Sequence, residues 1–220
     1  MAVALIVAAG RGERLGQGQP KALVPLSGRP MLQWSVDALR AVPAVQEIVV
    51  ALPSDRLDCA PEGTRAVAGG QTRSQSVRAA LGVVGDGDPV IVHDAARPLA
   101  SPALFERALG ALEGSGADAV VAAAPVPDTI KEVTGDGRTV SRTLERARLW
   151  AVQTPQVFRR ASLEAAFARA GDDILAAATD DAWLIEQEGG SVQVLPWAEP
   201  NVKVTTPAEL RLAEILLESR

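Results

Sequence analysis

Small residues and two cations follow the first apolar stretch of the chain. Leu5–Val7 is a short apolar run, typical of a strand buried on both faces of a parallel sheet. The loop after it carries almost no side chains, so a ligand can approach backbone N–H groups that donate well to phosphate oxygens. Arg14 and Lys21 add positive charge to the same loop. The pattern predicts a site for a polyanion such as a nucleoside triphosphate. The small residues are Ala8, Ala9, Gly10 and Gly12.

Two familiar nucleotide-binding motifs are absent from this loop. A dinucleotide fingerprint requires G-x-G-x-x-G, but after Gly10 and Gly12 the next glycine, Gly16, comes one position late. A P-loop requires a lysine preceded by glycine and followed by Ser or Thr, whereas Lys21 lies between a proline and an alanine. Hydride transfer is therefore not favoured. A glycine-rich turn with two solvated cations remains the plain structural alternative.

A second group of polar residues follows a later apolar run, 89–92. Asp94 comes just beyond that run, where α/β sheets bind ligands, and its carboxylate could hold Mg²⁺ or a ribose hydroxyl. A turn or helix cap is the bland alternative for a lone Asp. Arg97 is either a second phosphate contact or a surface residue. His93 is the only histidine, so we expect a packed or turn-bonded imidazole and no histidine metal cluster.

The elements that must position these residues alternate between strands and helices. Strands are expected at 5–7, 48–52, 65–68, 89–92, 119–124 and 191–195. Helices are expected at 30–41, 71–84, 101–112, 159–170, 179–190 and from Thr206 onward, where Glu209 completes a capping box. Lys203 falls in a β-type stretch before that last helix. The alternation predicts an α/β fold: one three-layer nucleotide-binding domain over 1–220 with a mostly parallel, twisted sheet.

An excursion interrupts this alternation at about 126–149. Apolar and polar residues alternate there around Gly135-Asp136-Gly137, which predicts a β-hairpin arm. A two-stranded arm is marginally stable alone, so it needs a surface to lie on. The partner subunit of a homodimer is the natural support, and a flap folded onto its own domain is the alternative.

Composition limits the classes of partner. Lys plus Arg number 22 against 27 for Asp plus Glu, a net charge of −5, which argues against a nucleic-acid binder and favours a small ligand. The single cysteine, Cys59, allows no intramolecular disulfide. The first apolar run is too short for a signal or membrane segment, so we expect a cytoplasmic protein without a membrane partner.

The chain resembles the 2-C-methyl-D-erythritol 4-phosphate cytidylyltransferase family over nearly its whole length. The motifs that carry the resemblance occur in the family's order: AAGRGERLGQGQPKAL, GGQTRSQSV, VHDAARP, PVPDTIK, TLERARLWAVQTPQVF, TDDA and NVKVTTP. The resemblance implies a nucleotide-diphospho-sugar transferase-like fold and the conversion of CTP and methylerythritol phosphate into a CDP-alcohol and pyrophosphate, in the non-mevalonate route to isoprenoids. It also implies Mg²⁺ or another divalent cation, and a homodimer with exchanged arms.

The same resemblance implies roles for individual residues. Arg14 and Lys21 match cations that stabilise charge on the CTP phosphates, and Arg146 and Lys203 match residues that hold the attacking phosphate. Positions that match the surroundings of the phosphates and cytosine are Ala8, Ala9, Gly10, Gly12, Gly70, Arg73, Ser76 and Ala95. Positions that match the substrate pocket are Asp94, Arg97, Thr129, Arg146, Thr179 and Lys203, with Asp94 also the metal candidate. Thr129 and Arg146 fall on the arm and, by resemblance, reach the other subunit's substrate.

This chemistry is consistent with a site that has no catalytic His or Cys. A phosphomonoester has its second pKa at about 6, so the nucleophile is already deprotonated at neutral pH and needs no general base. A ribitol 5-phosphate cytidylyltransferase and a non-catalytic CTP sensor remain alternatives. The sensor is disfavoured because Arg146 and Lys203, the cations expected for the second substrate, are present. Trp183 stands where a small residue is expected, which leaves the pocket shape near Thr179 open.

Overall fold

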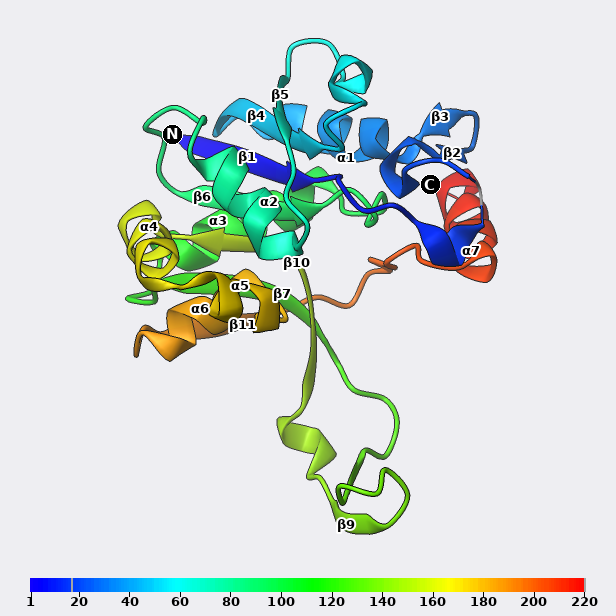
Figure 1. The fold of residues 1–220 in the computed structure, drawn as a ribbon, viewed down its shortest axis with the longest axis vertical. Coiled ribbons are helices and arrows are strands. Elements are labelled where there is room, and N and C mark those ends of the chain that lie inside the picture. The colour runs from blue at the N-terminus through cyan, green and yellow to red at the C-terminus, as the bar shows by residue number, and fades with distance from the viewer. Residues whose placement is uncertain (17, 220) are drawn as a thin grey trace.

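A computed structural model describes residues 1–16 and 18–219 of the chain. In this part of the chain the main feature is a seven-stranded sheet with the order β11-β7-β10-β6-β1-β4-β5 (Figure 1). Its strands are β1 (Ala2–Val7), β4 (Val45–Leu52), β5 (Arg65–Ala68), β6 (Val90–Asp94), β7 (Ala119–Pro125), β10 (Trp150–Phe158) and β11 (Val192–Pro196). Only β10 runs antiparallel to its neighbours, β6 and β7. The predicted α/β fold with a mostly parallel sheet is confirmed.

The register of the central strands brings their carboxyl ends to one edge of the sheet. Val7 at the end of β1 lies opposite Ala51 of β4 on one side and Asp94 of β6 on the other. Leu52 of β4 in turn lies opposite Ala68 of β5. The loops that follow these four strands therefore leave the sheet together, at the edge where parallel sheets bind ligands.

Helices cover both faces of the sheet, which gives the three predicted layers (Figure 1). On one face α1 (Met31–Arg40) and α3 (Pro102–Glu113) contribute Leu32, Leu39 and Phe105 to a buried cluster with the sheet. On the other face α2 (Arg73–Leu81), α4 (Arg160–Arg169), α5 (Asp172–Ala177) and α6 (Asp181–Gln187) pack through residues such as Val77, Leu163 and Ile185. Apolar side chains at helical spacing explain both faces.

A smaller cluster joins the C-terminal helix to the first part of the chain. Helix α7 (Pro207–Glu218) begins at the predicted Thr206–Glu209 capping box, and its Ala213 is buried with Leu26 and Val204. Leu26 belongs to a short hairpin of β2 (Pro25–Leu26) and β3 (Arg29–Pro30). Short 3-10 turns occur at η1 (Glu13–Leu15), η2 (Lys21–Leu23), η3 (Leu57–Cys59) and η4 (Arg146–Arg148). In the described residues no helix is long and apolar enough to cross a membrane.

The predicted hairpin is present and projects away from the sheet (Figure 1). Strands β8 (Lys131–Val133) and β9 (Val140–Thr143) pair antiparallel, and every residue of both strands is exposed. Asp136 closes the turn by accepting hydrogen bonds from the backbone N–H groups of Arg138 and Thr139, both at 2.9 Å. The arm therefore does not fold back onto its own sheet, and the side chains of Val133 and Val140 remain about half exposed.

Three features differ from the sequence prediction. Strand β10 was not among the predicted strands, and it carries Pro155, a residue that is unusual inside a central strand. The ladder with β7 is interrupted between Val152 and Gln156, which accommodates the proline. Helix α5 was not predicted. The stretch around Lys203 forms no strand, although the Val204 N–H donates to the Ala96 carbonyl at 2.8 Å.

Candidate active site

Three adjoining cavities occupy the carboxyl edge of the central strands. The inner pocket, of about 200 Å³, is lined by the small residues after β1 together with Lys21, Gly70, Arg73, Ser76, Asp94, Ala95 and Lys203. The outer cleft, of about 1300 Å³, is lined by Arg11, Gly12, Arg14, Lys21 and the residues after β4 and β5. The side pocket, of about 370 Å³, is lined by Arg73, Asp94, Arg97, Trp150, Thr154, Thr179 and Lys203.

The loop after β1 folds back so that Lys21 lies against its glycines. The Lys21 N–H donates to the Gly10 carbonyl at 3.2 Å, and Gly12 has a φ of +70°. A Cβ on Gly12 would lie only 2.8 Å from the Lys21 Cβ, so a side chain there would disturb the loop. The glycine pattern therefore serves to bring the Lys21 ammonium to the wall shared by the inner pocket and the outer cleft.

Lys21 is partly buried in a cationic setting. Burial, together with the nearby charges of Lys203 and Arg14, lowers the pKa of its ammonium to about 8 against the opposing effect of Asp94. An ammonium held at low dielectric beside other cations gains from a bound anion. Arg14 itself is exposed and lines the outer cleft.

The loop after β5 packs as closely as the first. A Cβ on Gly70 would lie 2.3 Å from the Gln75 Cβ, so only glycine fits there. The Gly70 N–H donates to Ser76 Oγ at 3.1 Å, and that hydroxyl donates to the Thr72 carbonyl at 3.0 Å. Thr72 and Gln75 form a reciprocal capping box at the start of α2. This bonding fixes the loop and the first turn of α2 at the rim of the inner pocket.

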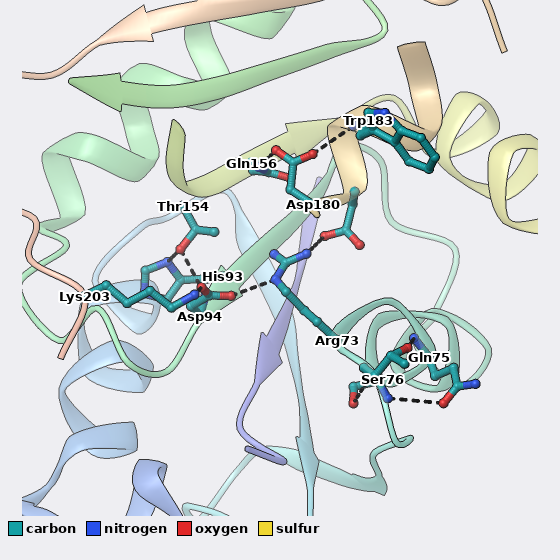
Figure 2. Close-up of polar contacts among 12 residues, drawn as sticks. Arg73, Gln75, Ser76, His93, Asp94, Thr154, Gln156, Asp180, Trp183 and Lys203 are labelled. Atoms are coloured by element: carbon teal, nitrogen blue, oxygen red, sulfur yellow. Dashed lines mark hydrogen bonds and ion pairs between the residues drawn. The ribbon is translucent and has the colours of Figure 1, made fainter. Parts of the chain in front are cut away.

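Asp94 lies at the centre of a charge cluster (Figure 2). Arg73 Nε donates to Asp94 Oδ1 at 3.0 Å, and Lys203 Nζ donates to Oδ2 at 2.6 Å. Burial alone raises the pKa of the Asp94 carboxyl, but Arg73 and Lys203 hold that pKa well below its usual range. Asp94 is the last residue of β6, so the strand itself holds this carboxylate between two cations from distant parts of the chain.

The second carboxylate of the cluster is Asp181, the first residue of α6. Arg73 Nη1 donates to Asp181 Oδ2, and the Asp181 side chain is fully buried. Burial raises the pKa of the Asp181 carboxyl, while for Arg73 the two carboxylates outweigh burial and raise the pKa of the guanidinium. The Arg73 guanidinium thus bonds to both carboxylates, through Nε to Asp94 and through Nη1 to Asp181.

Strand β10 holds the end of β6 in place through hydrogen bonds of Thr154. The Asp94 N–H donates to Thr154 Oγ1 at 3.0 Å, and the same hydroxyl lies 3.1 Å from His93 Nδ1. His93 is buried edge-on against Phe105, and burial lowers the pKa of its imidazole to about 4. The imidazole is therefore packed and neutral, as expected.

Arg97 ties the loop after β6 to the segment that carries Lys203. Arg97 is almost wholly buried, and its Nη1 donates to the Asn201 carbonyl at 2.7 Å. The Asn201 side chain in turn donates to Gln153 Oε1 and the Thr154 carbonyl, both at 2.9 Å. The surface position allowed for Arg97 is thus wrong, and Arg97 lines the side pocket.

The arm residues lie apart from these cavities. Thr129 and Arg146 are exposed, and Arg146 Nη1 donates to the Pro127 carbonyl at 2.6 Å. Neither lines the inner pocket, outer cleft or side pocket of its own chain. The structure thus brings together every predicted site residue except these two, with Thr179 exposed at the rim of the side pocket.

Trp183 does not narrow the side pocket. Its backbone N–H donates to Asp180 Oδ1 at 2.9 Å, and its indole packs on the buried cluster beneath α6. In Figure 2 the ring points away from Arg73 and Asp94. The Trp183 side chain is therefore not part of the lining of the side pocket.

Three residues at the site were missed from the sequence. Thr154 lies in the unpredicted strand, and Asn201 acts through both its side chain and carbonyl. Asp181 was read only as part of a capping sequence, since Asp180 and Asp181 both suit a helix start. Its two neighbours in the cluster lie far away in sequence, so no local pattern could have identified the contact.

The side chains at this site cannot supply a complete set of metal ligands by themselves. Within the described residues no three His, Cys, Asp or Glu side chains group closely enough to hold an ion. Asp94 is the one carboxylate among the described residues that line the inner pocket, and each of its oxygens already accepts a bond from a cation. Such a site fits Mg²⁺ only when phosphate oxygens and water supply the remaining ligands.

Comparison with known proteins agrees with an anion-binding transferase site. Residues 2–219 match the family model described as 2-C-methyl-D-erythritol 4-phosphate cytidylyltransferase. A protein of that name from Gloeobacter violaceus is 46% identical, covering 98% of this chain and 96% of its own. One from Frankia casuarinae is 50% identical, covering 97% of this chain and 80% of its own.

The fold shows the same likeness. The crystal structure of 2-C-methyl-D-erythritol 4-phosphate cytidylyltransferase from Thermus thermophilus superposes with a TM-score of 0.82 at 34% identity, covering 99% of this chain and all of the other. Since sequence and fold agree over the whole sheet and its edge loops, the chain belongs to the 2-C-methyl-D-erythritol 4-phosphate cytidylyltransferase family.

Proposed function

We propose that this protein transfers CMP from CTP to 2-C-methyl-D-erythritol 4-phosphate and releases pyrophosphate, a step of isoprenoid biosynthesis. The observation that carries the proposal is the arrangement of two pockets on opposite sides of Asp94 and Arg73, one beside the glycine loops and Lys21, the other beside Arg97 and Thr179. Two phosphorylated substrates can therefore approach each other at one point. We also propose that the reaction takes place in the cytoplasm.

CTP occupies the inner pocket and outer cleft in this proposal. The backbone N–H groups from Ala9 to Gly12 and the side chains of Arg14 and Lys21 face its phosphates, while Gly70, Ser76 and Ala95 surround the nucleoside. Negative charge grows on the α-phosphate and on departing pyrophosphate during transfer. Fixed N–H donors and cations stabilise that charge without reorganising.

The alcohol phosphate occupies the side pocket. One of its phosphate oxygens attacks the α-phosphorus of CTP, a new P–O bond forms, and the bond to the β-phosphate oxygen breaks. The attacking oxygen carries no proton at neutral pH, so this chain needs no base. Lys203 and Arg97 orient that phosphate and reduce its repulsion from the nucleotide.

We also propose that Mg²⁺ enters with the CTP phosphates. Asp94 is the one residue we assign to it, with the remaining ligands coming from phosphate and water. The ion would add charge neutralisation at the triphosphate. Lys203 and Arg73 share the same carboxylate, so they limit how far Asp94 can move toward such an ion.

The exposed arm leads us to propose a homodimer with shared sites. Thr129 and Arg146 reach no pocket of their own chain, and the arm exposes Val133 and Val140 to solvent. A partner subunit would cover these side chains and receive Arg146 beside the alcohol phosphate. Each site would then combine Lys21 and Lys203 of one subunit with Arg146 of the partner subunit.

Substrate choice is tested by pyrophosphate release. CTP and Mg²⁺ are supplied with either 2-C-methyl-D-erythritol 4-phosphate or ribitol 5-phosphate. Release with the first alone supports the proposal. Release with ribitol 5-phosphate alone would keep the mechanism and reassign the substrate, and release with neither would leave a CTP-binding protein without this activity.

Sharing of sites is tested by mixing two inactive variants. Lys21→Ala and Arg146→Ala each disable every site of a homodimer in this arrangement. In a mixed dimer one site receives a native Lys21 and a native Arg146, so about a quarter of the sites recover after subunit exchange. No recovery in a sample shown to contain mixed dimers would contradict an arm that acts in the partner's site.

A further inference from the structure

Asp181 carries a buried carboxylate that forms an ion pair with Arg73. Its side chain is fully buried, and Oδ2 accepts a hydrogen bond from Arg73 Nη1. Oδ1 makes no hydrogen bond with the described residues. Burying a carboxylate is costly unless a counter-charge lies close by, and here the counter-charge is the Arg73 guanidinium.

The start of α6 does not require this charge. The preceding residue, Asp180, already caps the helix, because its Oδ1 accepts from the Trp183 N–H at 2.9 Å. Asp180 also accepts a bond from Gln156 Nε2 at 2.8 Å. A small neutral residue in place of Asp181 would leave that cap intact, so the carboxylate of Asp181 has a use beyond the local helix.

Arg73 belongs to a wall between the two pockets. Arg73, Asp94 and Lys203 each line both the inner pocket and the side pocket, whereas Asp181 lines neither. Asp181 accepts its hydrogen bond from Arg73 Nη1, whereas Asp94 accepts from Arg73 Nε, so the two carboxylates meet different nitrogens of the guanidinium. The wall residues thus face the ligands, and Asp181 supports the wall from inside the protein.

The charges of this group balance in pairs. Arg73 is held between Asp181 and Asp94, and Asp94 is held between Arg73 and Lys203. Without Asp181, the planar guanidinium would be free to rotate and donate two parallel N–H bonds to Asp94. It would then compete with Lys203 for the same carboxylate. The position of Lys203 would then change although the substituted residue, Asp181, does not bond to it.

We propose that Asp181 is a positioning residue, which acts through Arg73 to fix Asp94 and Lys203 in the wall that separates CTP from the alcohol phosphate. The inference rests on the proposed function for the identity of the two ligands. It adds to that function a residue that touches neither substrate, carried on the helix that follows the Thr179 loop.

The direct test is Asp181→Asn, which keeps the shape and an acceptor oxygen but removes the charge. We expect kcat/KM for the alcohol phosphate to fall by up to about 100-fold, because a misplacement of about 1 Å can cost that much. We also expect weaker CTP binding by calorimetry. The matched control is Asp118→Asn, far from the pockets, where Asp118 accepts bonds from Ser162 Oγ at 2.6 Å and the Ser191 N–H at 2.8 Å.

A merely structural role and a positioning role differ in their kinetics. Asp118→Asn should lower the melting temperature and leave KM and kcat per folded molecule unchanged. Asp181→Asn should alter KM and kcat per folded molecule, measured well below its melting temperature. Wild-type kinetics in the Asp181→Asn protein would overturn the proposal.

A double-mutant cycle tests whether Asp181 acts through Arg73. Arg73→Lys keeps the charge, but one ammonium cannot bond both carboxylates in the same fork geometry. The loss from Asp181→Asn should be much smaller when Arg73 is already lysine. Equal losses in both backgrounds would overturn the proposal, as would wild-type kinetics in Arg73→Lys, which also serves if Asp181→Asn does not fold.

The same proteins separate this inference from the proposed function. Failure of the wild-type chain to release pyrophosphate would remove the proposed reaction alone. The calorimetric affinity for CTP would still report on the wall, and an unchanged affinity in both Asp181→Asn and Arg73→Lys would then overturn the positioning role.

Discussion

At the residue scale, Lys21 combines a partly buried ammonium with a proposed role at the CTP phosphates. Its pKa is lowered to about 8 by burial and by the neighbouring cations. The charged form dominates below that pH and is lost above it. A bound triphosphate favours the charged form, so CTP binding should be accompanied by proton uptake in mildly alkaline buffer.

This gives a pH dependence with a defined direction. We expect kcat/KM for CTP to decline above about pH 8, approaching tenfold per pH unit, since that parameter reports on the free enzyme. In Lys21→Arg the cation stays charged, so any remaining activity should lack this alkaline limb. A rate profile that stays level up to pH 10 in the wild-type protein would contradict the assignment.

Arg14 is the second cation expected at the CTP phosphates. Arg14→Ala should mainly lower kcat, by roughly 2.7–4 kcal/mol of transition-state stabilisation if its guanidinium acts as one oxyanion donor does. Because Arg14 is exposed, its removal should leave the melting temperature near the wild-type value. Arg11, exposed on the same cleft and without an assigned role, is the matched control. Unchanged turnover in Arg14→Ala would remove Arg14 from the mechanism.

Residues were predictable where their role depends on neighbours in sequence. Lys21 and Gly70 belong to strand-loop segments whose small residues and cations are contiguous, so their placement could be anticipated. Asp181 and Thr154 gain their contacts from β6 and α2, which are distant in the chain. Such contacts arise only from the order of strands in the sheet.

At the scale of elements, two capping boxes of the same kind allow a paired comparison. Thr72 starts α2 at the inner pocket, and Thr206 starts α7. Replacing either by Ala should cost about 1 kcal/mol of stability, a fall of about 2–4 °C in melting temperature. Only Thr72→Ala should also weaken CTP binding, because Thr72 lines the inner pocket. Equal affinities in the two variants would show that the cap does not shape the pocket.

Most elements could be read from apolar periodicity and helix caps, and the exceptions have separate causes. Strand β10 carries a proline, and the ladder around it is irregular, so its pattern falls below what periodicity can identify. Helix α7 presents the apolar side chain of Ile215 to solvent, because only the face around Ala213 packs against a neighbour. Position in the sheet makes β10 a strand despite its proline, and packing determines which apolar residues of α7 are buried.

At the scale of the whole molecule, the arm should link activity to assembly. The paired variant Val133→Asp with Val140→Asp places charges where we expect apolar contact with a partner, so it should dissociate the dimer. Sedimentation should then show monomers, and activity should be lost while the sheet still folds. Ser141→Asp, on the same hairpin, is the control for added charge. A fully active monomer would contradict the shared site.

The order of the strands also bears on how the chain folds as it is synthesised. Strands β6 and β7 each bond to β10, so neither has its full set of main-chain partners until residues 150–158 have left the ribosome. Until then the arm and the two open strand edges exist together, and open edges are sites of misassociation. The strand that joins β6 to β7 also delivers Thr154 to Asp94. A nascent chain therefore acquires its central charge cluster only when its most vulnerable edges have closed.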